Sequence, residues 1–327
     1  MALLEQLVSL LAAGETLSGR VLASRLGVSR ATVWNAVQSL QSMGLDIYAI
    51  RGTGYRIPKP FELLNREQIL ASFSNRVLQD DLSLSVLWEI ESTNSYLQKQ
   101  LPARGICVAE CQNAGRGRRG RRWVSPLGGN IYLSMSWTYQ SAPMALNGLS
   151  LACAVAVVNA LREYGLNGVS LKWPNDIQWQ GRKLAGLMLE LQGEAAGGCS
   201  VIVGIGINVN LTHSQGGHID QPWVALDQIM TKELPRRNYL VSLLVNNVAD
   251  VLRDFDRKGF QAYASAWKQF DAYLGRQVAI SQAAGQQVVG IYRGIDDDGL
   301  LMLDCDGEIK KFSSGDVSVR RIQSEPA

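Results

Sequence analysis

Histidine and long apolar runs are scarce in this chain of 327 residues, and each scarcity excludes a class of protein. The two histidines, His213 and His218, are both expected in loops, which disfavours an active site built on histidine. No stretch of eighteen apolar residues occurs, and no basic segment precedes a cleavable apolar run. We therefore expect no membrane span and no secretion signal. The length predicts a globular protein of two or three domains.

Cysteine is also scarce, and its five positions form no framework of pairs. The number is odd and the residues are scattered, which predicts reduced thiols in the cytoplasm. Cys107 and Cys111 are four residues apart, but no second pair follows, so a zinc site is not expected. The net charge of +3 is too small to predict nucleic-acid binding from the whole chain.

The first sixty residues have the pattern of a winged helix-turn-helix. Apolar residues at helical spacing predict three short helices, with a tight turn at Gly27 and with Ser29 as the cap of the third helix. Residues 47–57 then predict a hairpin with a glycine-rich, basic tip. Six basic and three acidic residues give this segment a net charge of +3. We predict a DNA-binding domain over residues 1–60.

The third helix of such a domain enters the major groove of DNA. The side chains that can reach phosphates or base edges are Ser29, Arg30, Thr32, Asn35 and, from the hairpin tip, Arg51. We expect Trp34 to be packed in the domain rather than to read bases. One module with so few basic contacts binds DNA weakly, so a dimer on a two-fold operator is expected. The alternative is a three-helix module used only for protein contacts.

An arginine–glycine run occupies residues 115–122, with the sequence Gly-Arg-Gly-Arg-Arg-Gly-Arg-Arg. So many guanidinium groups repel each other unless an anion lies among them, and glycine lets the backbone approach that anion. The run also matches the Gly-x-Gly-x-x-Gly pattern of dinucleotide-binding folds, but that pattern must open a helix. Residues 106–110 and 131–137 alternate as strands on either side. We predict an anion-binding loop between two strands; a solvated basic loop is the alternative.

Four further motifs place polar groups or glycines in or beside predicted strands. Ser92-Thr93-Asn94 begins a helix, as a cap or as part of a site. Lys172-Trp-Pro-Asn-Asp176 ends a strand abruptly, and is either a simple turn or a site for a nucleotide and its Mg²⁺. Lys183 lies in a strand of small residues, where its charge requires an acid or a ligand. Glycines in the strand 200–209 predict close approach of a ligand or of another strand.

The remaining segments predict helices followed by a small β domain. Residues 145–164, 239–257 and 260–270 have the composition or spacing of helices. From residue 277 onward, short alternating strands are separated by Asp-Gly turns, and the last strand begins at Val317. This pattern is typical of a small antiparallel barrel of the SH3-like type.

The order of these motifs resembles that of the biotin protein ligases. The resemblance rests on residues 92–94, on Gln112 before the arginine–glycine run, and on residues 172–176, 183–186 and 204–208. Together with the winged helix it covers the whole chain. The sequence is therefore similar to the bifunctional form of the family, which is both a biotin–[acetyl-CoA-carboxylase] ligase and a biotin operon repressor.

The resemblance implies an α+β fold and a two-step reaction. It implies a winged helix-turn-helix over residues 1–60, a mixed-sheet ligase domain of class II synthetase-like type over 61–272, and an SH3-like β-barrel over 273–327. Biotin and ATP, with Mg²⁺, would form biotinyl-5′-adenylate and pyrophosphate. A lysine of the biotin carboxyl carrier protein of acetyl-CoA carboxylase would then accept the biotin. The adenylate-bound homodimer would bind operator DNA and repress biotin synthesis.

The resemblance also assigns roles to residues of this sequence. The catalytic pair would be Lys183 and Arg118. The biotin-binding residues would be Ser92, Thr93, Asn94, Gln112, Arg116, Gly117, Arg118 and Lys183. Those that bind ATP or the adenylate would be Lys172, Asn175, Asp176, Trp123, Trp223, Asn208 and Arg320, with Asp176 also a ligand of Mg²⁺.

Two other functions are kept as alternatives. A non-enzymatic repressor would only sense biotin, but Lys183 and the intact motif at 172–176 speak against it. A lipoate ligase of similar fold is disfavoured by the arginine–glycine run and by the winged helix. Pyrophosphate release with biotin, compared with lipoate, would separate the three functions.

Overall fold

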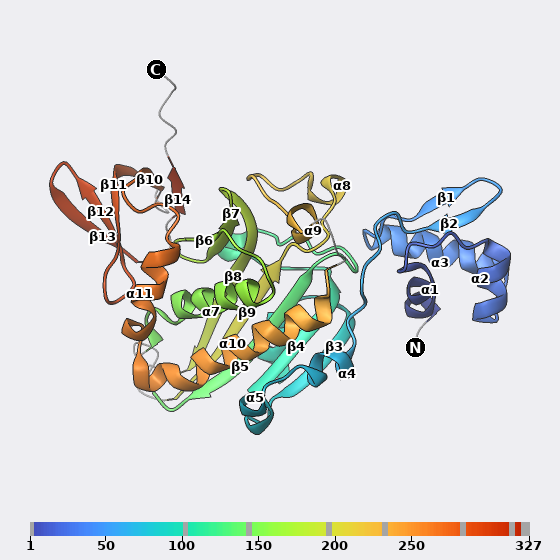
Figure 1. Ribbon diagram of the computed structural model, residues 1–327, viewed down its shortest axis with the longest axis horizontal. Coiled ribbons are helices and arrows are strands. Elements are labelled where there is room, and N and C mark those ends of the chain that lie inside the picture. The colour runs from blue at the N-terminus through green and yellow to red at the C-terminus, as the bar shows by residue number, and fades with distance from the viewer. Residues whose placement is uncertain are drawn as a thin grey trace, which may run out of the picture.

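The computed structural model has three parts in the order that the sequence predicts: a helical head with a hairpin, a large sheet with helices, and a small β domain (Figure 1). It describes residues 3–100, 104–141, 146–193, 198–230, 235–281, 286–313 and 318–321. Ala145 and Val317, where two predicted elements begin, lie outside the described residues, as does the chain after residue 321. None of the described helices is long and apolar enough to cross a membrane.

The N-terminal part folds as the predicted winged helix-turn-helix. Its elements are α1 (Leu3–Leu11), α2 (Gly19–Leu26), α3 (Arg30–Ser42), β1 (Tyr48–Ile50) and β2 (Gly54–Arg56). Ser18 and Ser29 accept backbone N–H groups of the first turns of α2 and α3, at 3.2 and 3.1 Å. Gly27 ends α2 with a φ of 66°, which glycine adopts without strain. Two serine caps and one glycine therefore fix the turn between the two helices.

Two sequence predictions are wrong at this level. Trp34 is not packed: it is 54% exposed, because α3 buries the side that contains its neighbour Val33. His213 is not in a loop but begins the short helix α8 (His213–Gly216), which Thr212 caps.

The central part is built on a seven-stranded mixed sheet. In spatial order its strands are β3 (Ser83–Ile90), β4 (Arg104–Gln112), β5 (Ile131–Tyr139), β9 (Cys199–Ile207), β8 (Arg182–Gly193), β7 (Asp176–Trp179) and β6 (Val169–Lys172). The pair β3–β4 is parallel and the other neighbours are antiparallel. The prediction of a mixed sheet within an α+β fold is confirmed.

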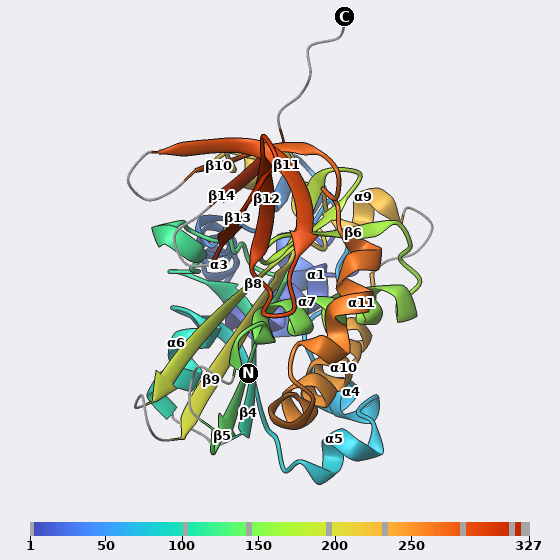
Figure 2. The same ribbon diagram turned by 90° about the vertical axis from the view of Figure 1, so that its left-hand side faces the viewer.

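Helices cover both faces of this sheet. Figure 2 shows α7, α10 and α11 on one side of the strands and α6 on the other. The helices of this part are α4 (Arg66–Ala71), α5 (Asn75–Gln79), α6 (Thr93–Gln100), α7 (Leu149–Glu163), α9 (Leu226–Ile229), α10 (Arg237–Lys258) and α11 (Gln261–Phe270). The main core lies between the sheet and α7, α10 and α11, and it continues into the C-terminal sheet.

The C-terminal part is a five-stranded antiparallel sheet, which confirms the predicted antiparallel strands, while the SH3-like barrel stays a prediction. Its order in space is β13 (Glu308–Phe312), β12 (Leu301–Cys305), β11 (Gln287–Ile295), β10 (Gln277–Ser281) and β14 (Ser318–Arg321). It lies at the end of the molecule away from the winged helix (Figure 1).

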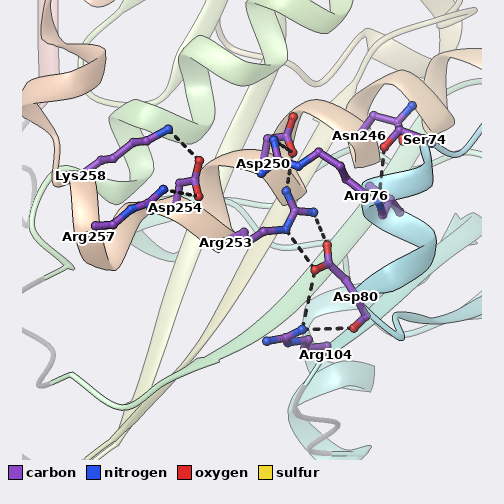
Figure 3. Close-up of polar contacts among 11 residues, drawn as sticks. Ser74, Arg76, Asp80, Arg104, Asn246, Asp250, Arg253, Asp254, Arg257 and Lys258 are labelled. Carbon is purple, nitrogen blue, oxygen red and sulfur yellow. Dashed lines mark hydrogen bonds and ion pairs between the residues drawn. The ribbon is translucent and has the colours of Figure 1, made fainter.

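A network of charged side chains fastens the segment after α5 to α10 and to the sheet (Figure 3). Asp80 is 6% exposed; it pairs with Arg253 of α10, and its carboxylate lies 3.7 Å from Arg104 of β4. Arg253 also pairs with Asp250 at 2.5 Å, and Asp250 with Arg76 at 3.2 Å. The hydrogen bond to Asp80 is the largest cause of a raised pKa at Arg253. The buried carboxylate is thus neutralised by two arginines from different elements.

Among the described residues, the most buried ion pair joins Arg237 of α10 to Glu110 of β4. Their side chains are 1% and 4% exposed, and Arg237 Nη1 lies 2.9 Å from Glu110 Oε2. Arg237 also donates to the carbonyl oxygen of Asn130, at 2.7 and 3.1 Å, and to that of Glu62, at 2.7 Å. Glu110 accepts the backbone N–H of Leu64 at 2.5 Å. The pair therefore pins the segment that follows the winged helix to the central sheet.

Replacing Arg237 with Ala should destabilise the central domain by about 3–5 kcal/mol, because it leaves the Glu110 charge buried without its partner. Urea unfolding followed by tryptophan fluorescence measures this as a lower midpoint. Arg257→Ala is the matched control, since Arg257 pairs with Asp254 but is 77% exposed. Its loss should cost less than about 1 kcal/mol. Equal costs for the two variants would contradict the role given to the buried pair.

Candidate active site

Loops and strand ends enclose a cavity of about 840 Å³. Its walls come from the end of α3, the start of α6, the arginine–glycine run, residues 172–176, strands β8 and β9, and residues 215–223. This volume is in the range of small-molecule sites. Of the residues predicted for biotin, ATP or the adenylate, all except Arg320 line this cavity. Motifs that are distant in the sequence therefore meet at one place in the fold.

The start of α6 brings neutral polar groups to the cavity. The backbone N–H of Thr93 donates to Gln112 Oε1 at 2.9 Å, and Ser134 Oγ lies 2.7 Å from Thr93 Oγ1 and 2.5 Å from Asn94 Oδ1. Ser92 Oγ accepts a backbone N–H of the first turn of α6 at 3.5 Å. The Ser-Thr-Asn motif is thus a helix cap and a wall of the cavity at once. These groups form an array of donors and acceptors that suits an uncharged polar ligand group.

Glycines in the sheet make room for side chains. A Cβ atom at Gly204 of β9 would lie 2.3 Å from Asn94 Oδ1, and one at Gly206 would lie 2.4 Å from the Trp123 ring. The sequence predicts a ligand or another strand as the group that approaches these glycines, whereas Asn94 and Trp123 occupy the space. The glycines therefore act indirectly, by letting two cavity-lining side chains lie against the strand.

The arginine–glycine run forms a further wall, and side chains of the run bind it to the rest of the chain. Arg116 pairs with Glu190 of β8 at 3.1 Å, and Arg118 donates to Asn175 Oδ1 at 3.3 Å. Residues 118–120 form one 3₁₀ turn, in which Arg119 has a φ of 58°. Glu190 also accepts from Asn94 Nδ2 at 2.7 Å. One carboxylate thus ties the loop to the neutral polar part of the cavity.

Glu190 and Ser134 bond to residues that line the cavity, and the sequence interpretation missed both. Glu190 lies on β8 at even spacing from Gly186 and Met188, both of which line the cavity. Successive side chains of a strand point to opposite faces, so a period of two carried along β8 would have identified Glu190. Ser134 is a polar residue inside the apolar strand β5, which is the signal that would have found it.

Another part of the cavity concentrates positive charge around Asp176. Lys183 Nζ lies 2.6 Å from Asp176 Oδ1, and Lys172 Nζ lies 3.9 Å from Asp176 Oδ2. Of the two partners that the sequence predicts for Lys183, an acid or a ligand, the structure shows the acid. Burial lowers the pKa of Lys172; Asp176 opposes this shift, and the charges of Lys183, Arg121 and Arg320 add to it. Two lysines share one carboxylate here, so a bound phosphate would neutralise an unbalanced charge.

Two tryptophans flank Lys183. The Lys183 ammonium lies 5.3 Å from the centre of the Trp123 ring, within the range of a cation–π contact. The residues on either side of Trp223 bond to the backbone of Lys183, and the Trp223 ring lies 5.4 Å from that of His213. Both rings line the cavity and give it flat apolar walls.

Asn208 and Arg320 are placed differently from the other predicted residues. Asn208 is buried, and its amide lies 3.4 Å from the carbonyl oxygen of Lys183 and 3.3 Å from that of Val224. It therefore braces the backbone that carries Lys183. Arg320 is exposed on β14, next to Val319, which lines the cavity.

Asp176 is also the predicted ligand of Mg²⁺. Among the described residues, no group of three or more His, Cys, Asp or Glu side chains is placed to hold a metal ion. Asp176 itself is paired with Lys183. This donor set fits a Mg²⁺ ion that arrives with the phosphates of a nucleotide and takes one carboxylate from the protein, and it does not fit a resident metal.

Some of the predicted DNA-contacting residues make hydrogen bonds within the protein, and others are exposed to solvent. Arg30 and Asn35 are exposed on α3, and Arg51 is exposed in the turn between β1 and β2. Ser29 Oγ accepts the backbone N–H of Thr32 at 3.1 Å and lies 2.9 Å from Thr32 Oγ1. Ser29 and Thr32 thus shape the start of the helix, while the other three side chains extend into solvent.

The winged helix also shares a boundary with the cavity. Met43 and Gly44, at the end of α3, line the cavity. The backbone N–H of Leu127 donates to the Met43 carbonyl oxygen at 3.3 Å, and Gln215 Nε2 donates to that of Gly44 at 2.7 Å. Leu127 follows the arginine–glycine run, and Gln215 precedes Trp223. The end of α3 therefore touches two walls of the cavity.

Family models match three separate parts of the chain. Residues 3–56 match an HTH domain, residues 86–210 match the Biotin/lipoate A/B protein ligase family, and residues 273–320 match the Biotin protein ligase C terminal domain. The order of these matches is that of the three structural parts.

Known proteins match this chain over most of its length. The bifunctional ligase/repressor BirA of Escherichia coli (strain K12) is 38% identical over 321 residues, which is 97% of this chain and 97% of that protein. BirA of Bacillus subtilis (strain 168) is 30% identical over 94% of this chain and 95% of that one. A solved biotin protein ligase from Aquifex aeolicus, in complex with biotin and ATP, matches with a TM-score of 0.62 and 30% identity, covering 73% of this chain and 99% of that one. The chain therefore belongs to the bifunctional ligase/repressor family of biotin protein ligases.

Proposed function

We propose that this protein uses ATP to attach biotin to a protein lysine, and that it represses transcription when it holds the activated biotin. The observation that carries the proposal is the cavity, where neutral polar groups around Thr93 and Asn94 share one space with the cations around Asp176. Biotinyl-5′-adenylate has both an uncharged polar head and a phosphate, and so fits such a cavity. Relatives that match nearly the whole chain are named bifunctional ligase/repressors.

In the first step, a carboxylate oxygen of biotin attacks the α-phosphorus of ATP. The bond to pyrophosphate breaks, and the mixed anhydride biotinyl-5′-adenylate forms. Two anions must approach each other, so neutralisation from fixed positions is the main requirement. Lys183 is held by Asp176 and Arg118 by Asn175, which keeps both cations in place. Asp176 would hold a Mg²⁺ ion that is bound to the ATP phosphates, and this ion would supply further positive charge.

In the second step, the amine of an acceptor lysine attacks the acyl carbon of the adenylate, and AMP leaves. We propose the biotin carboxyl carrier protein of acetyl-CoA carboxylase as the acceptor. Burial and neighbouring cations lower the pKa of Lys172, and the same surroundings would lower the pKa of an incoming lysine and favour its nucleophilic free amine. The five thiols are free, which supports a cytoplasmic location for this reaction.

The same ligand would control DNA binding through a homodimer. Among the described residues, β8 pairs with β9 as far as Gly193, but β7 pairs with β8 only as far as Gly186. This leaves a strand edge that a second copy can pair with, and Leu191 on it is 45% exposed. If the dimer binds the adenylate more tightly than the monomer does, the ligand favours the dimer and hence a two-fold operator.

Pyrophosphate release tests the first step of the ligase function. The protein should release pyrophosphate with biotin and ATP, but not with lipoate and ATP. An acceptor domain added afterwards should gain the mass of one biotin. No release with biotin would refute the ligase function, and preference for lipoate would assign a different substrate.

Lys183→Ala should slow adenylate formation by about 10²–10³-fold, because the variant lacks a fixed cation at the developing charge. Single-turnover pyrophosphate release measures this rate. Lys258→Ala is the control, since Lys258 pairs with Asp254 on the surface of α10 and should react like the parent protein. A Lys183→Ala rate within tenfold of the parent would remove Lys183 from the catalytic residues.

Arg118→Gly should loosen the wall over the adenylate, because the contact with Asn175 is lost. The adenylate should then dissociate faster, and lysines of unrelated proteins should become labelled. Arg119→Gly is the matched control: Arg119 is the next residue, and its φ of 58° suits glycine. Equal adenylate dissociation rates in the two variants would argue against the role of Arg118.

Arg30→Ala and Asn35→Ala should each weaken operator binding by about 1–3 kcal/mol if the side chain reads a base, and leave ligation unchanged. Fluorescence anisotropy with labelled operator measures binding, and acceptor labelling measures ligation. A loss of ligation in either variant would show that the two activities are not separable at these residues.

A further inference from the structure

Glu190 stands at one end of a chain of hydrogen bonds that leads to the cavity. Its Oε2 atom accepts the Asn94 Nδ2 amide at 2.7 Å and the Arg116 guanidinium at 3.1 Å. The Glu190 side chain is 20% exposed and lies behind the cavity wall, whereas Asn94 and Arg116 line the cavity. Any effect of Glu190 on a ligand therefore has to pass through one of these two neighbours.

The Glu190 carboxylate fixes which way the Asn94 amide points. Paired with Arg116, the carboxylate has no hydrogen to donate, so only the amide nitrogen of Asn94 can face it. The amide oxygen then faces Ser134 Oγ, at 2.5 Å. Asn94 is 5% exposed and lies against Gly204, where a Cβ atom would come within 2.3 Å of Asn94 Oδ1. Packing thus holds the plane of the amide, and Glu190 selects one of its two orientations.

The direction set at Asn94 continues through Ser134 to Thr93. Asn94 Oδ1 cannot donate, so the one hydroxyl hydrogen of Ser134 lies between Ser134 Oγ and Asn94 Oδ1. Ser134 Oγ is also 2.7 Å from Thr93 Oγ1, and this contact then needs the hydroxyl hydrogen of Thr93. Ser134 is fully buried, so water cannot replace either bond. Both hydroxyl hydrogens therefore point along the chain toward Glu190.

Thr93 consequently presents an acceptor to the cavity. Its hydroxyl hydrogen is committed to Ser134, although Gln112 Oε1 also lies 3.3 Å from Thr93 Oγ1. Its backbone N–H is committed to Gln112 Oε1, at 2.9 Å. Since Thr93 lines the cavity, it offers a ligand a lone pair on Oγ1 and no hydrogen.

An acceptor at this place distinguishes between two kinds of ligand head. The cyclic urea of biotin has N–H groups that can donate to Thr93 Oγ1, whereas the dithiolane ring of lipoate has none. A buried acceptor that loses its donor is unfavourable. A site built to pair with an N–H group therefore rejects a ligand that lacks one.

We propose that Glu190 is a positioning residue for biotin, whose carboxylate sets the direction of this hydrogen-bond chain and so keeps Thr93 Oγ1 as an acceptor for a ureido N–H. This inference rests on the proposed ligase function, in which biotin occupies the neutral polar part of the cavity. Glu190 acts through the chain and not on the reacting atoms. Without the carboxylate, the Asn94 amide can turn over, and the chain can reverse so that Thr93 donates into the cavity.

Glu190→Leu removes the acceptor but keeps a branched side chain of similar length. It should weaken biotin binding about tenfold, the effect of one hydrogen bond to the ligand, in isothermal titration calorimetry without ATP. In a pyrophosphate-release assay, the KM for biotin should rise by a similar factor, with the KM for ATP within about twofold of the parent. Glu190→Gln should bind biotin within about twofold of the parent, because its amide oxygen can still accept the Asn94 amide.

Biotinol, in which an alcohol replaces the carboxylate of biotin, separates the two paths that lead from Glu190. It has the ureido head but no negative charge for Arg116 to bind. Glu190→Leu should weaken the binding of biotinol and of biotin by the same factor. A loss for biotin alone would assign the effect to Arg116 and overturn the proposal.

Asp304→Leu is the matched control for the loss of an ion-paired carboxylate from a strand. Asp304 lies on β12 and pairs with Arg293 at 2.7 Å, and its side chain is 18% exposed. Biotin binding and both KM values should stay those of the parent. A loss of biotin binding equal to that of Glu190→Leu would overturn the proposal in favour of general destabilisation.

Ser134→Ala interrupts the same chain at its middle and also serves if Glu190→Leu does not fold. It should weaken biotin and biotinol binding equally, because the Thr93 hydrogen loses its fixed acceptor. The double variant should bind biotin no more weakly than the weaker single variant, since both changes remove one effect. Multiplying effects would overturn the path through Ser134.

The parent protein separates failure of this inference from failure of the ligase function. A parent that binds biotin but releases no pyrophosphate with ATP would refute the ligase function alone, since biotin binding still measures the role of Glu190. A parent that binds no biotin would refute both. With a working parent, unchanged biotin binding in Glu190→Leu and Ser134→Ala would refute only the positioning role.

Discussion

Arg237 stands at the centre of the constraints that hold the site in shape. It pairs with Glu110 two residues before β4 ends, and it donates to the carbonyl oxygen of Asn130 one residue before β5 begins. Both ends of the loop that contains the arginine–glycine run are thus bound to one buried cation. The linker joins the same network through Glu62 and Leu64. Since a buried charge is costly without its partners, these segments have a single favourable arrangement.

The floor of the cavity is formed where β8 and β9 have glycines in place of larger residues. Gly204 and Gly206 leave space that Asn94 and Trp123 fill, and Gly186 lies close to the same tryptophan. The side chains of Asn94 and Trp123, which come from elements beside the sheet, therefore pack directly against its strands. A side chain at Gly204 or Gly206 would push Asn94 or Trp123 toward the ligand. Glycine in these strands thus sets the depth of the cavity, although it contributes no chemical group.

Local patterns predicted the elements of this fold, because helix caps, strand alternation and Asp-Gly turns act over a few residues. They also predicted that Lys183 needs an acid or a ligand, since a buried charge has to be neutralised. They could not name partners that are brought together by the sheet, such as Glu190 for Arg116 or Arg237 for Glu110. Trp34 was mistaken for a buried residue because its type favours burial, while the helical phase that exposes it depends on the buried neighbours of α3.

The contact of Met43 and Gly44 with Leu127 and Gln215 has a consequence for exchanging domains with other regulators. A foreign winged helix joined near residue 60 would keep the chain continuous but replace part of the ligand cavity. New operator specificity would therefore have to be introduced at the start of α3, with the end of that helix left intact. The DNA-binding domain and the ligand cavity share helix α3. Substitutions at the start of α3 can therefore change operator specificity, whereas substitutions at its end also change the cavity wall.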